Sequence, residues 1–342
     1  MKTWSIQWHI TTKCEQRCRH CYIFNSPEGK KEIEGEKRMT WPMLKKIAND
    51  IKNTSDNFGA NCNVAITGGD PLLHQNFWNL LFYLTELRGI KISIMGNPWL
   101  ITNKVAKNLK MAGVNTFQLS IDGMRQVHDF WRKKGSFGQT IRAVKVLQKN
   151  GIRVAIMTTV SKGNVADVPK IIELVSDELQ VAVYAFARYV PTHRDSNEMF
   201  TPQEYRQFLD TIWPYYASRV NGKTSFNLKD HLWTLYLYEK GLFEPQDTKN
   251  VIVAGCGLGI NHLTILADGT VYACRRFHSP LGKVPEEKLV DMFFSSKMEM
   301  YRKTSSLEKC KDCFLKCYCR GCMAMTYGVT GDWRKPDPQC WR

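Results

Sequence analysis

The sequence predicts an α/β fold, in which a parallel sheet is covered by helices, followed by a smaller cysteine-rich region. Two observations carry this prediction. From Trp4 to about Tyr189, short runs of β-branched and apolar residues alternate with amphipathic helical stretches. This alternation is typical of a parallel sheet with helices packed outside it. Residues 246–342 hold eight of the twelve cysteines, and in a chain without a secretion signal such cysteines indicate metal binding.

The predicted elements follow one another as strand, loop and helix. The strands are expected at Ser5–Thr11, Asn63–Thr67, Lys91–Met95, Thr116–Ile121, Arg153–Val160 and Val181–Arg188. The helices are expected at Trp41–Ile51, Phe77–Leu87, Thr102–Met111, Thr140–Gln148 and Val168–Val175. Gly89, Gly113 and Gly151 each follow a helix and precede a strand, where a left-handed C-cap is expected. Six such units are too few for a closed eight-fold barrel.

Two other segments, a charged one and a helix start, bear on how the chain is divided. Residues 24–38 are strongly charged, with seven Lys or Glu residues from Glu28 to Lys37, so we predict a surface loop there. Thr201-Pro202-Gln203-Glu204 has the composition of a helix start. We therefore predict a strand–helix domain over residues 1–200, a helical connector over 201–245 and a cysteine-rich domain over 246–342.

Three cysteines, Cys14, Cys18 and Cys21, follow the first predicted strand at C-x3-C-x2-C spacing. Three thiolates on a short loop can hold three corners of a cubane iron–sulfur cluster and leave the fourth iron open to a small molecule. Free or zinc-bound cysteines are the alternative, although zinc usually takes four protein ligands. The run resembles that of the radical S-adenosylmethionine (radical SAM) enzymes, with His20 at their aromatic position. The resemblance implies a partial (β/α)6 TIM-like barrel that binds a [4Fe–4S] cluster and SAM.

The same resemblance assigns SAM-binding roles to polar residues at strand ends. Gly68-Gly69-Asp70-Pro71 matches the family segment that binds the SAM amino group, with Asp in place of Glu. Ser120 and Arg132 would bind the methionine carboxylate, and Asp122 would lie near the ribose. Each of these patterns alone is also that of an ordinary turn or surface charge. The expected cofactor-binding residues are His20, Tyr22, Gly68, Gly69, Asp70, Asn97, Ser120, Asp122, Arg132 and Thr158.

The later cysteines resemble the SPASM extension of radical SAM peptide-modifying enzymes. Cys256 precedes a predicted hairpin turn at Asp268-Gly269 that leads to Cys274. The resemblance implies two auxiliary [4Fe–4S] clusters, so that the chain would hold three. The outer cluster would be bound by Cys310, Cys313, Cys319 and Cys340, and the inner one by Cys256, Cys274 and Cys322.

Because of two departures from the SPASM pattern, the fourth ligand of the inner cluster is not assigned. The spacing from Cys319 to Cys322 is one residue short, and Cys317 is an extra cysteine. The fourth inner ligand is therefore Cys317, an open iron or neither. A pair of structural zinc sites is the alternative for the whole region. Cys62 belongs to no motif and is expected to be a buried strand residue.

The bulk composition limits the partners. The formal charge is +16, but the basic residues occur in short groups and no nucleic-acid-binding motif is present. Solvated faces or attraction of an acidic peptide are therefore favoured over nucleic-acid binding. No apolar run is as long as a membrane helix, and we expect a cytoplasmic protein with no membrane partner.

The resemblance implies a radical SAM/SPASM peptide maturase. It would make a 5′-deoxyadenosyl radical and oxidatively cross-link or modify a residue of a ribosomally synthesised peptide, through a thioether or carbon–carbon bond. Residues 7–11 and 21–24 resemble SPASM proteins that accompany cysteine-repeat peptides of the ACGX type. One alternative is an anaerobic sulfatase-maturase-like enzyme, in which an Asp base stands where this chain has Arg275. The other is a non-catalytic, metal-stabilised, basic nucleic-acid-binding module.

The resemblance implies two partners, a peptide substrate and a reductant such as flavodoxin or ferredoxin. If the chain is of the ACGX type, the peptide would be rich in cysteine. Only thirteen residues precede Cys14, so leader recognition is expected from a separate protein or another surface. Replacing Arg275 and Arg276 by Glu is expected to weaken binding of an acidic peptide without loss of iron. The catalytic base, the bond formed and the oligomeric state are not assigned. We expect structural rather than catalytic roles for Arg188, Tyr189, His193 and Arg275.

Overall fold

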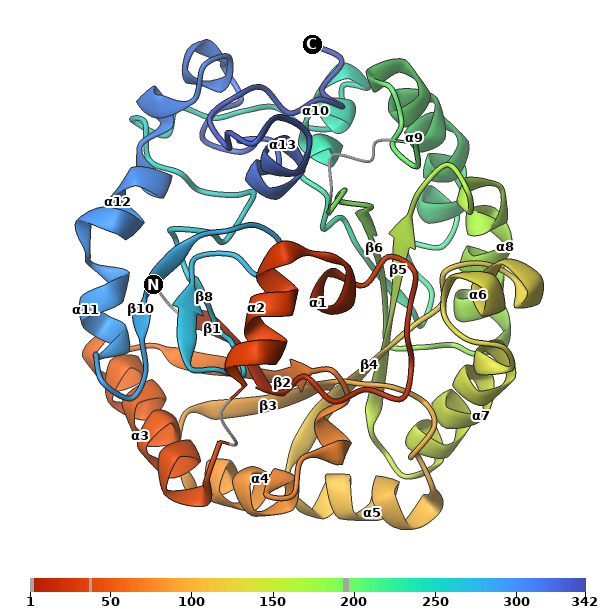
Figure 1. Cartoon of the computed structure of the whole chain (residues 1–342). Coiled ribbons are helices and arrows are strands. Elements are labelled where there is room, and N and C mark those ends of the chain that lie inside the picture. Colours follow the sequence, from red (N-terminus) through yellow and green to blue (C-terminus); the bar gives the residue numbers. More distant parts are fainter. Residues whose placement is uncertain (1–2, 37–38, 193–196) are drawn as a thin grey trace.

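The computed structural model describes residues 3–36, 39–192 and 197–342. Its strands form one ten-stranded sheet in the order β10-β9-β8-β1-β2-β3-β4-β5-β6-β7. Figure 1 looks into the open end of this curved sheet, with helices around its outside. The strands are β1 (Thr3–Thr11), β2 (Asn61–Gly68), β3 (Ile90–Met95), β4 (Val114–Ser120), β5 (Arg153–Val160), β6 (Val183–Arg188), β7 (Ser225–Asn227), β8 (His262–Ile265), β9 (Thr270–Tyr272) and β10 (Pro280–Lys283).

The outer helices alternate with the strands, as the sequence predicts. They are α3 (Trp41–Asn57), α4 (Phe77–Glu86), α5 (Asn103–Met111), α6 (Arg125–Trp131), α7 (Ser136–Lys149), α8 (Val168–Glu173), α9 (Pro202–Ala217) and α10 (Leu232–Glu239). The cysteine-rich end adds α11 (Leu289–Phe293), α12 (Ser296–Arg302) and α13 (Met323–Thr330). None of the described helices is long and apolar enough to cross a membrane.

The pairing of the strands confirms the predicted fold class, a partial α/β barrel. Strands β1 through β7 are parallel to their neighbours and β8 is parallel to β1, whereas β8 with β9 and β9 with β10 pair antiparallel. The predicted left-handed glycines are also present, with φ of 81° at Gly89, 67° at Gly113 and 70° at Gly151. Helix α9 begins with the predicted capping box of Thr201 and Glu204.

Alternate residues of β1 face opposite layers. Trp4 packs edge-on against Phe58 beside α3, with ring centroids 5.3 Å apart, so that Trp4, Ile6, Trp8 and Ile10 belong to the buried apolar core. Their neighbours Ser5, Gln7 and His9 are polar and point to the other side of the strand. Polar groups therefore line the inside of the barrel, where a ligand can be held.

The cysteine-rich end is joined to the barrel through the sheet itself. Strand β8 pairs in parallel with β1, with Ser5 opposite His262 and Trp8 opposite Ile265. The predicted hairpin at Asp268-Gly269 is present as β8 and β9, which pair antiparallel. The sheet thus continues across residue 246, and the division of the chain into three parts stays a prediction.

The prediction of a surface loop over residues 24–38 is wrong where the structure describes it; Lys37 and Arg38 lie outside the described residues. This segment forms α1 (Tyr22–Asn25) and α2 (Pro27–Gly35), which lie over the open end of the barrel (Figure 1). Ser26 caps α2 by accepting a hydrogen bond from the Gly29 amide. Glu32 is only 1% exposed, because a buried carboxylate with ionic partners can take a core position.

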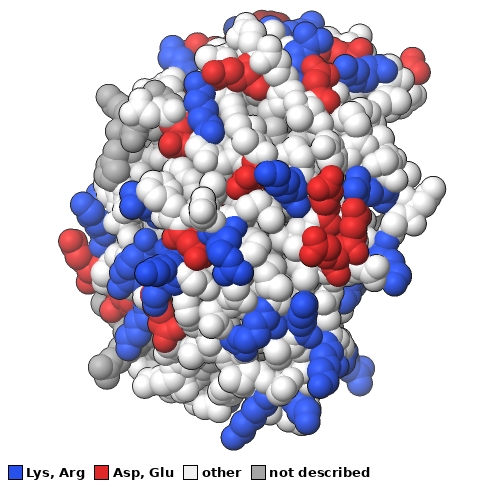
Figure 2. Space-filling view, turned by 90° about the vertical axis from the view of Figure 1, so that its right-hand side faces the viewer, with Lys and Arg blue, Asp and Glu red and all other residues white. Residues whose placement is uncertain are grey.

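The basic residues are less scattered than the sequence alone indicates. Neither α5 nor α7 contains an Asp or Glu, and together they carry Lys104, Lys107, Lys110, Arg142, Lys145 and Lys149, all exposed. Within the described part of the chain, none of the six is in an ion pair. Figure 2 shows Lys and Arg side chains gathered over the lower part of this face. We call these six residues the basic face.

Candidate active site

The three N-terminal cysteines lie on the loop that follows β1, at the carboxyl end of the parallel sheet. Cys14, Cys18 and Cys21 are all partly buried. The Asn97 side-chain amide donates to Cys14 Sγ at 3.1 Å, and Arg132 Nη1 lies 3.8 Å from Cys18 Sγ. Burial raises the pKa of the Cys18 thiol to about 11, although the Arg132 charge opposes this shift. Donors aimed at sulfur favour thiolates at this position.

Two glycines allow the cysteine loop to pack against the end of β2. A Cβ on Gly68 would lie 2.0 Å from the Thr11 carbonyl oxygen, and one on Gly69 would lie 2.1 Å from that of Lys13. Backbone hydrogen bonds from Gly69 to Thr11 and from Asp70 to Lys13 fix this approach. The glycines therefore position the cysteine loop itself.

Asp70 has the properties of an ammonium site. It is fully buried; its Oδ1 accepts from the Leu72 amide at 3.2 Å, whereas its Oδ2 has no hydrogen-bond partner. Burial raises the pKa of this carboxyl to about 7. A buried carboxylate oxygen without a partner is costly, and a cationic amino group placed beside it would remove that cost. This donor set fits the amino group of SAM.

Asp122 is surrounded by protein partners. Its carboxylate accepts from Arg132 Nε at 2.5 Å and from the Thr159 amide at 2.8 Å, and His20 Nε2 lies 3.4 Å away. Thr158 is also enclosed, since its hydroxyl donates to the Ile121 carbonyl at 2.7 Å. The structure thus brings His20, Asp122 and Arg132 together beside Cys18, and it places Thr158 in the buried layer next to them. Ser120 ends β4 in the same region.

The four cysteines predicted for the outer site do converge. Cys310, Cys313, Cys319 and Cys340 line one small cavity of about 30 Å³ together with Asp337. Arg342 Nη1 lies 3.8 Å from Cys313 Sγ. Burial raises the pKa of Cys310 to about 11, and the neighbouring thiols Cys340 and Cys313 add to the shift. A cavity lined by four thiols fits a cysteine-bound cluster.

The inner cysteines also lie together, beside the guanidinium group of Arg276. Arg276 Nη2 lies 3.6 Å from Cys322 Sγ, and its charge also acts on Cys274 and Cys256. Burial alone would raise the pKa of Cys256, but a hydrogen bond from His231 and the charge of that imidazole lower it to about 6. Sequence patterns did not indicate His231, because it stands alone at the start of α10.

The two remaining cysteines have different surroundings. Cys62 on β2 is fully buried in the apolar core, as predicted. Cys317 is buried and its carbonyl accepts from the Val253 amide at 2.9 Å, but it does not line the cavity of the outer cysteines. Its role as a ligand stays a prediction.

A cavity of about 300 Å³ is lined by residues that directly follow an N-terminal and an inner cysteine. It is lined by residues from both regions, among them Tyr22, Glu28, Arg275, Arg276, Phe277 and Tyr327. Tyr22 directly follows Cys21, and Arg275 directly follows Cys274. The cavity therefore lies beside both cysteine sites, and its wall combines aromatic rings with two guanidinium groups. His193 lies outside the described residues.

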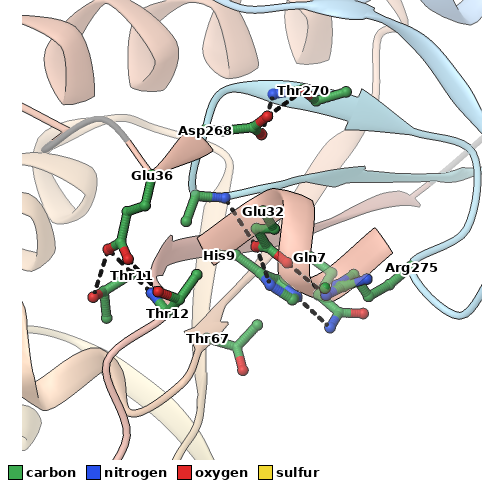
Figure 3. Close-up of polar contacts among 12 residues, drawn as sticks. Gln7, His9, Thr11, Thr12, Glu32, Glu36, Thr67, Asp268, Thr270 and Arg275 are labelled. Carbon is green, nitrogen blue, oxygen red and sulfur yellow. Dashed lines mark hydrogen bonds and ion pairs between the residues drawn. The ribbon is translucent and has the colours of Figure 1, made fainter. Parts of the chain in front are cut away.

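Arg275, which lines this cavity, belongs to a buried polar network (Figure 3). Glu32 Oε2 accepts from Arg275 Nη2 at 2.5 Å, and its Oε1 lies 3.1 Å from both His9 Nδ1 and the Ala267 amide. Gln7 connects His9 to the Tyr22 hydroxyl at 3.2 Å and 3.5 Å. Burial alone would raise the pKa of Glu32, but His9 and Arg275 hold it at about 2. Sequence reasoning missed Glu32, because a charged run is most often solvated.

The arrangement of ligands differs from that of a single metal ion. Among the described residues, no three His, Cys, Asp or Glu side chains are grouped so that they could hold one ion. In a cubane cluster each thiolate binds a different iron, so the ligands stand further apart than those of zinc.

The chain is similar to known proteins both in sequence and in fold. The model of the radical SAM superfamily matches residues 8–175, and that of the SPASM iron–sulfur cluster-binding domain matches residues 256–314. The chain is 26% identical to an AdoMet-dependent heme synthase of Methanosarcina barkeri, over 98% of this chain and 95% of that protein. It is equally identical to a cysteine-type anaerobic sulfatase-maturating enzyme of Clostridium novyi, over 91% and 85% of the two chains.

A third relative is the mycofactocin maturase MftC of Mycolicibacterium smegmatis, 26% identical over 98% of this chain and 82% of that protein. Two solved structures share the fold. Native anSMEcpe with bound AdoMet has a TM-score of 0.76 and 20% identity, covering 98% of this chain and 93% of that one. Streptococcus suis SuiB bound to its precursor peptide SuiA has a TM-score of 0.75 and 17% identity, covering 100% and 76%.

Proposed function

Because this chain is a radical SAM protein with a C-terminal SPASM domain, we propose that it oxidatively modifies a residue of a ribosomally synthesised peptide. The radical SAM and SPASM domains imply SAM, a SAM-binding [4Fe–4S] cluster and auxiliary clusters as cofactors. The finer proposal concerns the substrate and the product, which is a thioether or a carbon–carbon cross-link.

One observation carries the proposal: the cavity of about 300 Å³ is lined both by Tyr22, which follows Cys21, and by Arg275, which follows Cys274. Its volume is at the lower end of the range for ligand pockets, roughly 300–1,000 Å³. This space suits one side chain and its neighbouring backbone rather than a large rigid molecule. A peptide can thread such a cavity and place one residue between the SAM site and the inner auxiliary site.

When bound, the cluster and SAM supply a 5′-deoxyadenosyl radical that takes a hydrogen atom from the substrate. The chain's own residues prepare the site for this step. Cys14, Cys18 and Cys21 would hold the cluster, and Asn97 and Arg132 donate toward their sulfurs. Asp70 would bind the SAM amino group, since its buried Oδ2 has no partner.

The overall change balances as a two-electron oxidation. For a thioether, one substrate C–H bond and one S–H bond break and one S–C bond forms. A hydrogen atom would leave with 5′-deoxyadenosine, the thiol would lose a proton, and an auxiliary cluster would be the group able to accept the remaining electron. Arg276 lines the cavity from which that electron would come, and its Nη2 lies 3.6 Å from the sulfur of the inner Cys322.

A tetrapyrrole substrate is the second candidate, because the chain is also similar to an AdoMet-dependent heme synthase and an Fe-coproporphyrin III synthase. The Arg276 guanidinium in the cavity wall would suit a carboxylate side chain. The sulfatase-maturase alternative has less support, since Arg275 stands at the position of the Asp base and is bound to Glu32. The nucleic-acid-binding alternative is not supported, because the chain belongs among radical SAM enzymes.

The test is a turnover assay of the anaerobically reconstituted full chain with SAM and dithionite. The candidate substrates are short cysteine-rich peptides encoded beside its gene, and Fe-coproporphyrin III. We expect a peptide product lighter by two hydrogens, formed together with 5′-deoxyadenosine. A peptide with its cysteines replaced by serine is the matched control for a thioether. Conversion of the porphyrin but of no peptide would overturn the proposal.

A further inference from the structure

We propose that Arg188 is a positioning residue that fixes the inner and the outer auxiliary cysteine sites relative to the barrel. Because one side chain supports both sites, the incorporation of iron into one site is coupled to its incorporation into the other. Arg188 ends β6 and is 2% exposed. Its guanidinium also lies over the Tyr205 ring, 5.0 Å from the centroid. The inference concerns the auxiliary sites alone and does not depend on the identity of the substrate.

A first set of hydrogen bonds connects Arg188 to the inner site. Its Nε donates to Asp230 Oδ2 at 2.7 Å, and Asp230 Oδ1 accepts from the Leu232 amide at 3.0 Å. These bonds fix the turn before α10. The next residue in that turn, His231, is close enough to the Cys256 thiol to lower its pKa. The position of this inner ligand is thereby tied to the end of a barrel strand.

A second set of hydrogen bonds connects Arg188 to both sites through Asp337. Arg188 Nη1 and Nη2 bind the two Asp337 oxygens at 2.9 Å and 2.8 Å, in a bidentate pair. Asp337 Oδ2 also accepts from the amide of Cys322, an inner cysteine, at 2.8 Å. Asp337 itself lines the cavity of the outer cysteines. One carboxylate thus contacts the backbone of one site and the wall of the other.

The same guanidinium fixes the chain just before the last outer cysteine. Arg188 Nη1 donates to Gln339 Oε1 at 2.9 Å, and the Gln339 amide donates to Asp337 Oδ1 at 3.0 Å. Cys340 is the next residue. In addition, the Arg188 carbonyl accepts from Arg276 Nη1 at 3.3 Å, and Arg276 is the residue that reaches Cys322 Sγ.

The charges explain why no other residue type fits this position. Two buried carboxylates, Asp230 and Asp337, share one buried guanidinium. Removing the cation would leave both carboxylates without a counter-charge beside thiolates that are themselves negative. Lysine would keep the charge, but its single ammonium group cannot form the planar bidentate contact and the bond to Asp230 together.

The test measures iron, labile sulfide and EPR spectra of the reconstituted full chain. The variants are Arg188→Met, Arg188→Lys, Asp230→Asn and Asp337→Asn. Arg219→Met, which breaks the exposed pair with Asp177, is the matched control. Arg188→Met, Asp337→Asn and Asp230→Asn should each lose about eight of about twelve irons, because each removes one charge of the group that joins the two sites. The SAM-sensitive EPR signal of the N-terminal cluster should remain in all of them.

Arg188→Lys provides the decisive spectroscopic measurement, since it keeps the charge and is the variant best suited to fold. We expect shifted midpoint potentials for both auxiliary clusters and an unchanged N-terminal cluster. The proposal is overturned if this variant has wild-type potentials and iron content. It is equally overturned if the N-terminal signal falls in parallel with the auxiliary ones, because that would be a general loss of folding.

Discussion

The Glu32 carboxylate and the Arg275 guanidinium lie 2.5 Å apart in the protein interior, and both side chains are almost completely buried. Arg275 also covers the Tyr22 ring, 4.4 Å from its centroid. The charge of Arg275 is therefore balanced within the protein and is not free for an acidic peptide. Arg276, which forms no ion pair among the described residues, contacts Cys322. Replacing it by Glu is now expected to cost iron at the inner site, which changes the expectation from sequence.

Breaking this pair should destabilise the protein. Arg275→Met leaves the Glu32 carboxylate buried with only neutral donors, so we expect a loss of about 3–5 kcal/mol in the free energy of unfolding. Denaturant unfolding of the metal-free protein would measure it. The double variant Arg275→Met with Glu32→Leu should recover most of the loss. An unchanged unfolding midpoint in Arg275→Met would show that the pair contributes nothing.

SAM binding should depend on pH through Asp70. Its folded pKa, about 7, is raised above the value of an exposed Asp by burial, with Glu15 nearby adding to the shift. The carboxyl therefore ionises only as the pH rises through 7, and an ammonium ligand needs the ionised form. We expect SAM affinity to fall roughly tenfold per pH unit below that pKa, measured by calorimetry on the reconstituted protein.

Asp70→Asn should abolish this dependence, whereas Asp268→Asn, a turn carboxylate bonded to Thr270, should keep it. The sign also applies to stability. A raised carboxyl pKa means that the folded SAM-free protein holds the proton more tightly than the unfolded chain. Its stability is therefore lost as the pH rises from the unfolded pKa toward 7. A flat SAM affinity in the wild type would argue against the Asp70 assignment.

The N-terminal cysteines should load independently of the C-terminal ones. Wild-type protein should hold about twelve irons after reconstitution, and the variant with Cys14, Cys18 and Cys21 all changed to Ala should hold about eight. Metal and labile sulfide analysis would check this. Because Cys317 does not line the outer cavity, Cys317→Ala tests its predicted role at the inner site separately. Zinc in place of iron would contradict the cluster assignment.

The basic face should speed reduction by an acidic carrier protein. Lys133 connects this face to the cysteine loop, since its Nζ donates to the Glu15 carbonyl at 3.2 Å and lies over the Trp99 ring. Changing Lys104, Lys107 and Lys145 to Glu should slow reduction by an acidic flavodoxin at least about tenfold at low salt. The difference should shrink at high salt, because screening removes it.

Stopped-flow oxidation of the flavodoxin hydroquinone would follow this step. Reduction by dithionite should be unaffected, since a small anion does not need a docking surface. The matched control changes Lys288, Lys297 and Lys303 to Glu, an equal change of charge on the helices of the SPASM region. Equal slowing by both triple variants would mean that only net charge matters.

The sequence by itself determined the alternation of strands and helices, the left-handed glycines and the two groups of cysteines. These features are local: periodicity, capping residues and ligand spacing act over a few residues, so they can be read along the chain. Tertiary structure alone decided the use of polar residues far apart in sequence. Glu32 joins His9 and Arg275, and Arg188 joins Asp230 and Asp337, because the sheet brings β1, β6 and the last turn of the chain to one place. A buried charge is stable only where such partners meet, and that meeting is a property of the fold rather than of any local pattern.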